Sequence, residues 1–447
     1  MADTGGAVQE ATHLDAARSE TTHRWPQVLP GGKAILFTSS ADNNFFGKAC
    51  VEAAPLATGM PKVIVENAYF GRYIPGGYLA YVSQGTVFVV PFDAQKLKVT
   101  GTAIPVVQGL NSDITNGSAQ ISFSDNGTAV YLSGAGMAHN VNVALIDRKG
   151  TSTVLASDQQ DASSPRFSPD GKRLVFGKGA NSIWVHDIAR GTTSQVTGSV
   201  GALFPIWTPN GERITYIRPA SAGTGAGLGI FWKRSDGAGD EVELLHLNTP
   251  FAFPSSWSPD GKTLLFNQQA AKDGNCCEVW SLTLDADGKA EAPKLLLPAT
   301  GFPAYPAFSP DGRWIAYMSG ESGAPQVYVI PASGSGGKWQ ISNQGGIEPR
   351  WSSAGHELFY ISVRTLMAVP YTVEKNSFQA GNPEPVVGDR LEMRAPFTSY
   401  DVEPDGQHFV IFEFPAGQGA SAAEPTVVLN WLDDARQLVA AGQTGVK

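Results

Sequence analysis

Hydrophobic and polar residues alternate in short runs along the chain, and turn-forming sequences separate the runs. In residues 165–176, Phe167 precedes Ser-Pro-Asp-Gly, and Leu174 and Phe176 alternate with smaller or polar neighbours after it. Proline presets φ for the second turn position, and glycine supplies the left-handed residue that allows the two strands to pair. This stretch is therefore predicted to form a β-hairpin.

The same hairpin pattern recurs nine times, with turn glycines 40 to 51 residues apart. These are Gly32, Gly77, Gly127, Gly171, Gly211, Gly261, Gly312, Gly355 and Gly406. Four residues before the glycine, seven of the nine copies have an aromatic residue. These positions are Val28, Tyr73, Phe123, Phe167, Trp207, Trp257, Phe308, Trp351 and Val402. Because this position is aromatic in most copies, its side chains are predicted to pack on one another as a column.

Most copies continue with a third and a fourth short β-rich run, such as residues 153–155 in the third copy and 426–432 in the ninth. Four short strands per period of 40–50 residues are typical of propeller blades. The sequence predicts an all-β protein, a single closed β-propeller domain over residues 1–447 with four-stranded antiparallel blades. Nine blades are expected, with eight as the alternative because propellers usually have about 4–8.

The two ends of the chain suggest how this ring closes. The ninth copy has no fourth run, and residues 7–14 resemble one without another obvious partner. We therefore expect the N-terminal strand at 7–14 to complete the last blade and remove its exposed edge. Residues 433–447 are expected to form a C-terminal tail.

Charge and cysteine content narrow the function classes. The net charge is −9 with no Lys/Arg cluster, which argues against nucleic acid or an anionic membrane as partner. No apolar run approaches the roughly 20 residues of a membrane helix, and the chain opens on polar residues rather than on a basic and apolar leader. The three cysteines are Cys50, Cys276 and Cys277, and the adjacent pair is expected as two thiols rather than as a vicinal disulfide.

Three of the hairpins carry a family resemblance. They resemble the WD40-like PD40 repeat of TolB-type β-propellers at residues 167–174, 257–264 and 308–315. Residues 14–26 and 428–432 are also similar to the ends of the C-terminal propeller of bacterial, especially acidobacterial, eukaryote-like serine/threonine kinases. That resemblance implies an extracytoplasmic sensor or interaction module.

The residue types that carry chemistry in related propellers form no catalytic pattern here. The chain has no Gly-x-Ser-x-Gly elbow, and its seven histidines are scattered without metal-ligand spacing. The repeated aspartates at 170, 260, 311 and 405 are explained by their turn position rather than by calcium. We expect no enzymatic activity, no cofactor and no metal site.

One position in the first strand of each repeat varies between the copies, and the column of side chains at this position is the candidate binding site. It directly precedes the aromatic position and alternation turns it towards the channel that the first strands surround. Its polar members offered as ligand-binding candidates are Gln27, Arg72, Arg166, Arg350 and Asp401. The alternative is that the arginines bond to carbonyls or acids of neighbouring blades.

The predicted function is a non-catalytic propeller that binds a protein, peptide or small ligand, as the sensor domain of a membrane serine/threonine kinase. A monomer is expected. The alternatives are a propeller hydrolase or lyase with a metal in the channel, and a structural scaffold without a ligand.

Overall fold

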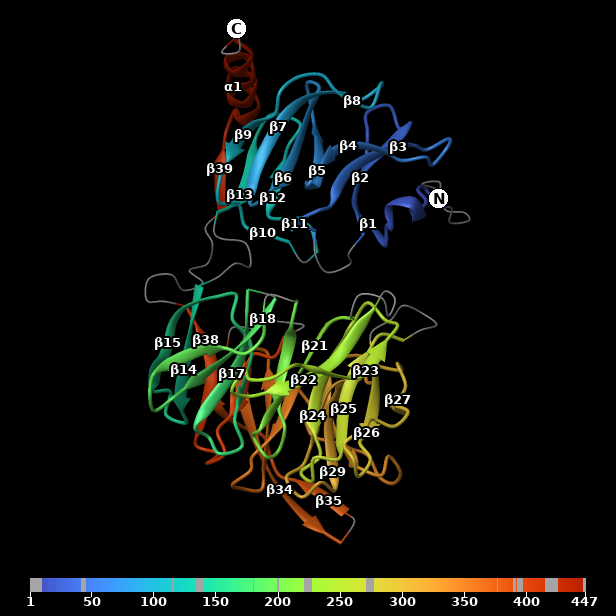
Figure 1. Cartoon of the computed structure of the whole chain (residues 1–447). Helices are drawn as coiled ribbons and strands as arrows, with labels where there is room; N and C mark the ends of the chain where they lie inside the picture. The colour runs from blue at the N-terminus through green and yellow to red at the C-terminus, as the bar shows by residue number, and fades with distance from the viewer. Residues whose placement is uncertain are drawn as a thin grey trace. The chain divides into compact units, whose positions relative to one another are not determined.

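The computed structural model describes most of the chain. The described residues are 10–41, 46–114, 116–133, 140–179, 181–198, 201–220, 227–270, 277–375, 377–388, 391, 397–414 and 425–444. They are almost entirely β-structure in antiparallel sheets, as the repeat predicts (Figure 1). Among them, no helix combines the length and the apolar character needed to cross a membrane.

The chain forms two compact units rather than the single domain predicted for residues 1–447. Unit 1 comprises Met1–His139 and Ala420–Lys447, and unit 2 comprises Asn140–Gly419. Unit 2 is therefore inserted into unit 1. The insertion lies between β13 (Ala129–Leu132) and β39 (Pro425–Val428), which pair directly with one another.

Unit 1 contains the first three hairpins. Its first sheet is β1 (Thr22–Val28), β2 (Ala34–Ser40), β3 (Cys50–Pro55) and β4 (Lys62–Glu66), preceded by the short helix η1 (Ala16–Arg18). The second is β5 (Tyr69–Ile74), β6 (Tyr78–Ser83), β7 (Thr86–Asp93), β8 (Lys98–Val99) and β9 (Ile104–Val107). The third is β12 (Ile121–Phe123), β13 and β39, and a short pair is formed by β10 (Ser112–Asp113) and β11 (Ser118–Ala119).

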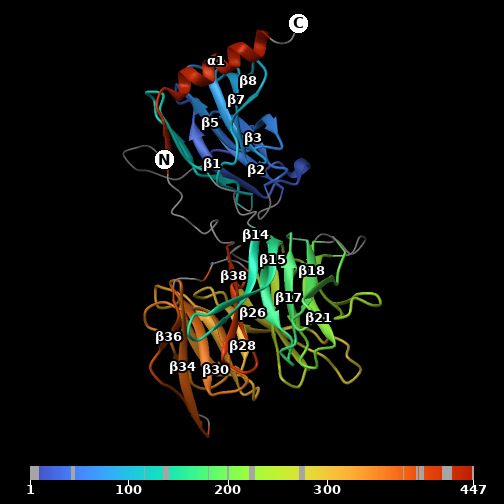
Figure 2. The same ribbon diagram turned by 90° about the vertical axis from the view of Figure 1, so that its left-hand side faces the viewer.

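The expected C-terminal tail is a helix, α1 (Trp431–Thr444), that packs on unit 1 beside β7 and β9 (Figure 2). Its apolar side buries Trp431, Leu432, Ala435 and Val439 in the core formed by the second and third sheets. Unit 1 thus depends on both ends of the chain.

Unit 2 contains the other six hairpins, each in a sheet of its own. Five of the sheets are each formed by strands that follow one another in the sequence. The first is β16 (Ser163–Phe167), β17 (Arg173–Lys178), β18 (Ser182–Asp187) and β19 (Thr192–Gln195), and the second is β20 (Leu203–Trp207), β21 (Arg213–Pro219), β22 (Leu228–Arg234) and β23 (Val242–Leu247). The third is β24 (Ala252–Trp257), β25 (Thr263–Gln268), β26 (Glu278–Thr283) and β27 (Lys294–Leu297), the fourth is β28 (Ala304–Phe308), β29 (Trp314–Ser319), β30 (Gln326–Pro331) and β31 (Trp339–Gln340), and the fifth is β32 (Ile347–Trp351), β33 (Glu357–Ser362), β34 (Thr365–Glu374), β35 (Ser377–Ala380) and β36 (Glu384–Val387). The sixth combines β37 (Tyr400–Val402) and β38 (His408–Glu413) with β14 (Asn140–Asp147) and β15 (Ser152–Gln160).

The inner strands of unit 2 form a closed ring of six blades in the part of the chain that the structure describes. Each first strand lies beside the next, from β16 through β20, β24, β28 and β32 to β37, and β37 lies beside β16. The turns follow the same order, because in four of the six the turn glycine abuts the proline of the preceding blade. A Cβ on Gly312 would lie 3.3 Å from Pro259, and one on Gly171 would lie 3.5 Å from Pro404 of the sixth blade.

The prediction of one ring with nine blades, or eight, is therefore wrong, as is the closure by residues 7–14. The hairpin at Gly406 is completed by β14 and β15, since β14 pairs with β38 from Asn142 to Asp147. Residues 10–14 are not in a strand, and 7–9 lie outside the described residues. The third and ninth repeats have therefore exchanged their outer strands. The sequence assigned β39 to the ninth repeat as its third strand, but β39 pairs with β13 of the third repeat.

The repeated turn and the aromatic column behave as the sequence predicts within unit 2. Ser168 Oγ donates to Asp170 Oδ1 at 2.6 Å and that same oxygen accepts the Lys172 amide, so the aspartate closes the turn. The Trp207 indole donates to the carbonyl of Arg166 in the preceding blade at 3.1 Å. The shared aspartate is thus a structural residue of the hairpin.

The cysteines differ from expectation at one position. Cys277 is disulfide-bonded, whereas two free thiols were predicted at the adjacent pair. Cys276 lies outside the described residues. Adjacent cysteines leave the choice between thiols and a disulfide to the local backbone, which the sequence does not show.

Candidate functional site

A cavity of about 490 Å³ lies at the axis of unit 2, lined by its six first strands and their turns. The column that the sequence predicted to face the channel does so in every blade of this unit. Its members there are Arg166, Ile206, Ser256, Ala307, Arg350 and Asp401. Three of the five predicted binding residues are therefore brought together by the ring.

The other two candidates, Gln27 and Arg72, lie in unit 1 and bond to backbone. The Gln27 side chain accepts the Tyr73 amide at 2.7 Å and donates to the Tyr73 carbonyl at 3.3 Å. Arg72 Nη1 donates to the carbonyls of Trp25 at 2.8 Å and Gly71 at 2.9 Å. Both side chains therefore connect β1 to β5 through backbone groups. This agrees with the alternative expectation, in which the arginines bond to carbonyls or acids of neighbouring blades rather than to a ligand.

The wide end of the unit 2 cavity is lined by the hairpin turns. The turn prolines Pro169, Pro209, Pro259, Pro310 and Pro404 all border it, together with Trp207, Trp257 and Trp351 of the aromatic column. A volume within the usual range of about 300–1,000 Å³ and a mixed polar and aromatic lining are properties of ligand sites. Three tryptophans at its wall make the cavity accessible to fluorescence measurements.

The inner ends of these strands are shaped by repeated β-bulges. Non-glycine residues adopt left-handed backbone there: Ser164 (φ 52°), Phe204 (φ 54°), Tyr305 (φ 54°) and Glu348 (φ 52°). The pairing register shifts at each of these positions. Bulges redirect side chains, and strained backbone of this kind clusters at functional sites.

The sequence reasoning did not identify these bulge residues. Each of the four is followed by proline, which takes the next position in the strand. The recurring X-Pro pair before the column residue was the available signal. It marks an irregularity near the axis, although it does not predict a positive φ for X.

A buried ion pair accompanies the bulges. Arg350 Nε lies 3.7 Å from Asp401 Oδ1, and the other Asp401 oxygen accepts the Phe167 amide at 2.8 Å. Desolvation by burial raises the pKa of Asp401 above its usual value, against the lowering effect of Arg166 and Arg350. Arg166 donates to the Tyr400 carbonyl at 3.2 Å, so the charged groups connect the sixth blade to the first and the fifth.

Glu348 forms the second buried carboxylate of this region. It is 1% exposed, and its two oxygens accept the Ser399 amide at 2.7 Å and the Ser399 hydroxyl at 3.0 Å. Desolvation raises the pKa of Glu348, and the Ser399 hydrogen bonds and Arg350 only partly offset this effect. This side chain links the fifth blade to the segment before β37.

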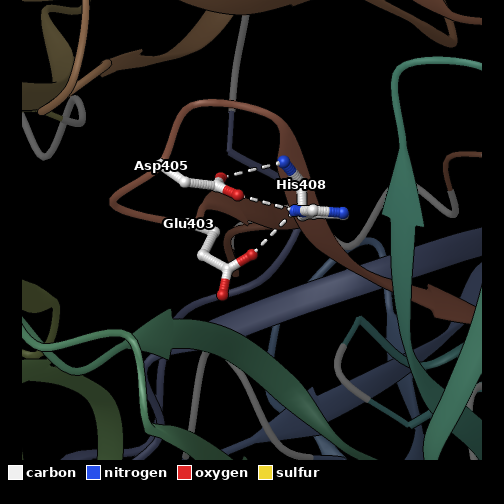
Figure 3. A group of neighbouring side chains, drawn as sticks. All are labelled: Glu403, Asp405 and His408. Carbon is white, nitrogen blue, oxygen red and sulfur yellow. Dashed lines mark hydrogen bonds and ion pairs between the residues drawn. The ribbon is translucent and has the colours of Figure 1, made fainter.

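A third group of titratable residues lies at the last turn, where Glu403 stands in place of the usual serine and Asp405 pairs with His408 (Figure 3). His408 Nδ1 lies 2.8 Å from Asp405 Oδ2 and 3.0 Å from Glu403 Oε2. The three ligand atoms are close enough to hold a metal ion. Because the histidine already pairs with both acids, the ion triad accounts for the geometry, and we assign no metal here.

The His408 triad gives a pH prediction. Desolvation lowers the pKa of His408, but the Asp405 hydrogen bond and the charges of Asp405, Glu403 and Asp147 outweigh it and raise the pKa overall. Asp405→Asn keeps the turn-closing oxygen, so we expect it to lower the His408 midpoint in an NMR titration. Asp147→Asn is expected to have a smaller effect, and an unchanged midpoint in Asp405→Asn would contradict the triad.

Unit 1 has its own buried polar cluster, centred on Glu52. Glu52 is 1% exposed and accepts Ser39 Oγ at 2.7 Å and Arg18 Nη1 at 2.6 Å. Glu20 Oε2 lies 3.0 Å from His23 Nε2 and accepts the Asp15 amide. The cluster ties the segment before β1 to β3, and we assign it a structural role.

Comparisons with known proteins give no family for the chain. No family model matches the chain. It is 24% identical over 249 residues to a tricorn protease homolog of Saccharolobus solfataricus, covering 53% of this chain and 21% of that protein. It is 25% identical over 194 residues to the uncharacterized peptidase YuxL of Bacillus subtilis, covering 41% and 25%. The matches thus span about a quarter or less of these two relatives.

Two further similarities concern proteins of a more comparable length. The uncharacterized protein Atu1656 of Agrobacterium fabrum is 24% identical over 272 residues, covering 56% of this chain and 84% of that protein. Among solved structures, a protein assigned as TolB from Agrobacterium tumefaciens has 20% identity and a TM-score of 0.48, covering 62% and 99%.

The prediction that the chain has no enzymatic activity is corrected by these comparisons. Curated relatives that it matches are named as a protease homolog and a peptidase, so a missing sequence motif does not place the chain outside enzymes. The attachment to a kinase and the extracytoplasmic location stay predictions. By its sheets and its repeated hairpin the chain is a β-propeller protein similar to TolB-type propellers.

Proposed function

We propose that the chain is the ligand-binding propeller part of a peptidase-class enzyme, and that the channel of unit 2 receives an extended peptide. The observation that carries the proposal is the cavity of about 490 Å³ at the axis of a closed ring. It combines aromatic walls with buried charged groups, which suits a chain that has both apolar side chains and a polar backbone. The names of the curated relatives support the peptidase class.

The proposal assigns recognition, not the hydrolytic step, to the cavity residues. Among the described residues that line the cavity, Asp401 is the only carboxylate and there is no histidine. Catalytic zinc sites use about three protein ligands. The alternative of a hydrolase or lyase with a channel metal therefore gains no support from the lining.

Peptide binding and cleavage are tested together on the whole chain. A library of peptides of different lengths is incubated with the protein, cleavage is followed by mass spectrometry, and binding is followed by tryptophan fluorescence. We expect saturable fluorescence changes because three tryptophans border the cavity. Absence of both binding and cleavage for every peptide would contradict the proposal.

A variant that blocks the channel identifies the site. Ser353 lines the cavity and is exposed, so Ser353→Trp places a large side chain at the wide end without disturbing a core. The control is Ser333→Trp, on an exposed turn of unit 2 that does not line the cavity. We expect loss of peptide binding in the first variant only. Equal binding in both would place the ligand elsewhere.

A further inference from the structure

The narrow end of the unit 2 channel contains a second, much smaller cavity of about 10 Å³. Arg166, Ile206, Ser255 and Arg350 line both cavities, so the small one adjoins the floor of the large one. Three of the bulge residues, Ser164, Phe204 and Tyr305, lie in its wall. Its apolar part consists of the rings of Phe204, Phe253 and Tyr305, which pack on one another with centroids 5.1 and 5.7 Å apart.

Three buried donors at this small cavity have no hydrogen-bond partner among the described residues: Ser164 Oγ, Thr398 Oγ1 and Arg350 Nε. Their side chains belong to residues that are 2%, 5% and 8% exposed. The 3.7 Å separation of Arg350 Nε from Asp401 is too long for a hydrogen bond. Buried polar groups nearly always have partners, so three together at one cavity call for a bound group.

The charges around the small cavity favour an anion. Both arginines line it and no carboxylate does. Asp401 borders only the large cavity, and both oxygens of Glu348 are engaged by Ser399. Desolvation and the neighbouring Arg350 lower the pKa of Arg166 to about 9, against the raising effect of Asp401 and Glu348.

We propose that Ser164, Thr398 and Arg350 bind the carboxylate of a ligand at the narrow end of the channel. One carboxylate oxygen enters the small cavity, and the apolar part next to the carboxylate packs on Ile206, which lines both cavities. The remainder of the ligand lies in the large cavity. The inference rests on the proposed function of the channel and specifies the group that the channel recognises.

A single water molecule is the competing occupant. A cavity of about 10 Å³ is near the lower limit for one water, and three donors surround it. A water accepts at most two of those hydrogen bonds, whereas the two oxygens of a carboxylate together offer about four acceptor positions, and its charge also offsets the charge of the arginines. The experiment must therefore separate a carboxylate from its uncharged analogue.

The probes are 3-phenylpropionate and its amide, titrated by calorimetry and tryptophan fluorescence against the whole chain. Thr398→Val removes one donor without changing shape, and Thr192→Val, on the exposed edge strand β19, is the control. We expect the acid to bind, the amide to bind at least about tenfold more weakly, and Thr398→Val to weaken the acid about tenfold, since hydrogen bonds to charged groups are strong. The melting temperature of Thr398→Val is expected to stay unchanged or rise, because an unpartnered buried hydroxyl is removed.

Paired peptides with a free or an amidated C-terminus distinguish a peptide ligand from a small acid. Preference for the free terminus, lost in Thr398→Val, supports both the carboxylate site and the proposed function. Binding of 3-phenylpropionate without any peptide would keep the carboxylate site and contradict the peptide channel. Equal binding of acid and amide, or a crystal structure with the acid present and only water between the three donors, would overturn the carboxylate site.

Discussion

Ending the chain at Phe414 is expected to unfold unit 1 and to leave unit 2 folded. The truncation removes β39, which pairs along all of β13, and α1, which buries Trp431, Leu432, Ala435 and Val439. Each large apolar side chain lost from a core costs about 1.5–3 kcal/mol, and a domain has only about 5–15 kcal/mol in total. Calorimetry should show two transitions for the whole chain and one for the truncated chain.

A shorter truncation is the matched control. Ending the chain at Val439 removes residues 440–447 and keeps all four buried residues of α1. We expect both transitions to persist, with the one from unit 1 shifted only slightly. Two transitions in the chain ending at Phe414 would contradict the insertion of unit 2 into unit 1.

Glu348→Ala is expected to lower the melting temperature of unit 2 by on the order of 10 °C. The substitution removes the carboxylate that accepts the buried Ser399 amide and hydroxyl, and it removes one of the carboxylates that offset the charge of Arg350, the other being Asp401. It also removes the link from the fifth blade to the segment before β37. Thermal unfolding monitored by circular dichroism measures the shift.

Glu348→Gln is the conservative control because an amide still pairs with both groups of Ser399. Burial raises the folded-state pKa of Glu348 above its unfolded value, so its contribution to stability is fully present below the unfolded pKa. That contribution is lost as the pH rises through the folded pKa. The stability of Glu348→Gln relative to the unmodified protein should therefore rise with pH, and a pH-independent difference would count against a buried carboxylate at this position.

The local structure of this protein follows from its sequence because each repeat encodes its own hairpin. The Ser-Pro-Asp-Gly turn, the packed tryptophan and the column facing the axis all depend on contacts within one repeat or between neighbours. Arg166, Arg350 and Asp401 were identified from alternation alone, and the structure places all three at one cavity. Whether they bind a ligand is a proposal.

The division into two units could not be read from the repeat. The hairpins at Gly127 and Gly406 have the same pattern, so either can be completed by either set of outer strands. The pairing of β14 with β38 joins residues more than 260 positions apart, and nothing in the local pattern specifies it. Unit 2 closes because the first and last of its strands share one sheet, which removes the exposed edges.

The residues at the narrow end of the channel escaped prediction for a different reason. Ser164, Phe204, Tyr305 and Glu348 have little in common as side chains, and they share a backbone conformation and a following proline. A search by residue type finds no motif among them. Thr398 lies in the segment that precedes β37, outside every repeat strand.

The central claim is that the channel of unit 2 is the ligand site, and hydrogen–deuterium exchange on the whole chain tests it most directly. Exchange is measured with and without a saturating peptide that carries a free C-terminus. The account predicts added protection in β16, β20, β24, β28, β32 and β37 and in the turns of these blades, with unit 1 unchanged. Protection confined to unit 1 or to the outer strands of unit 2 would contradict it.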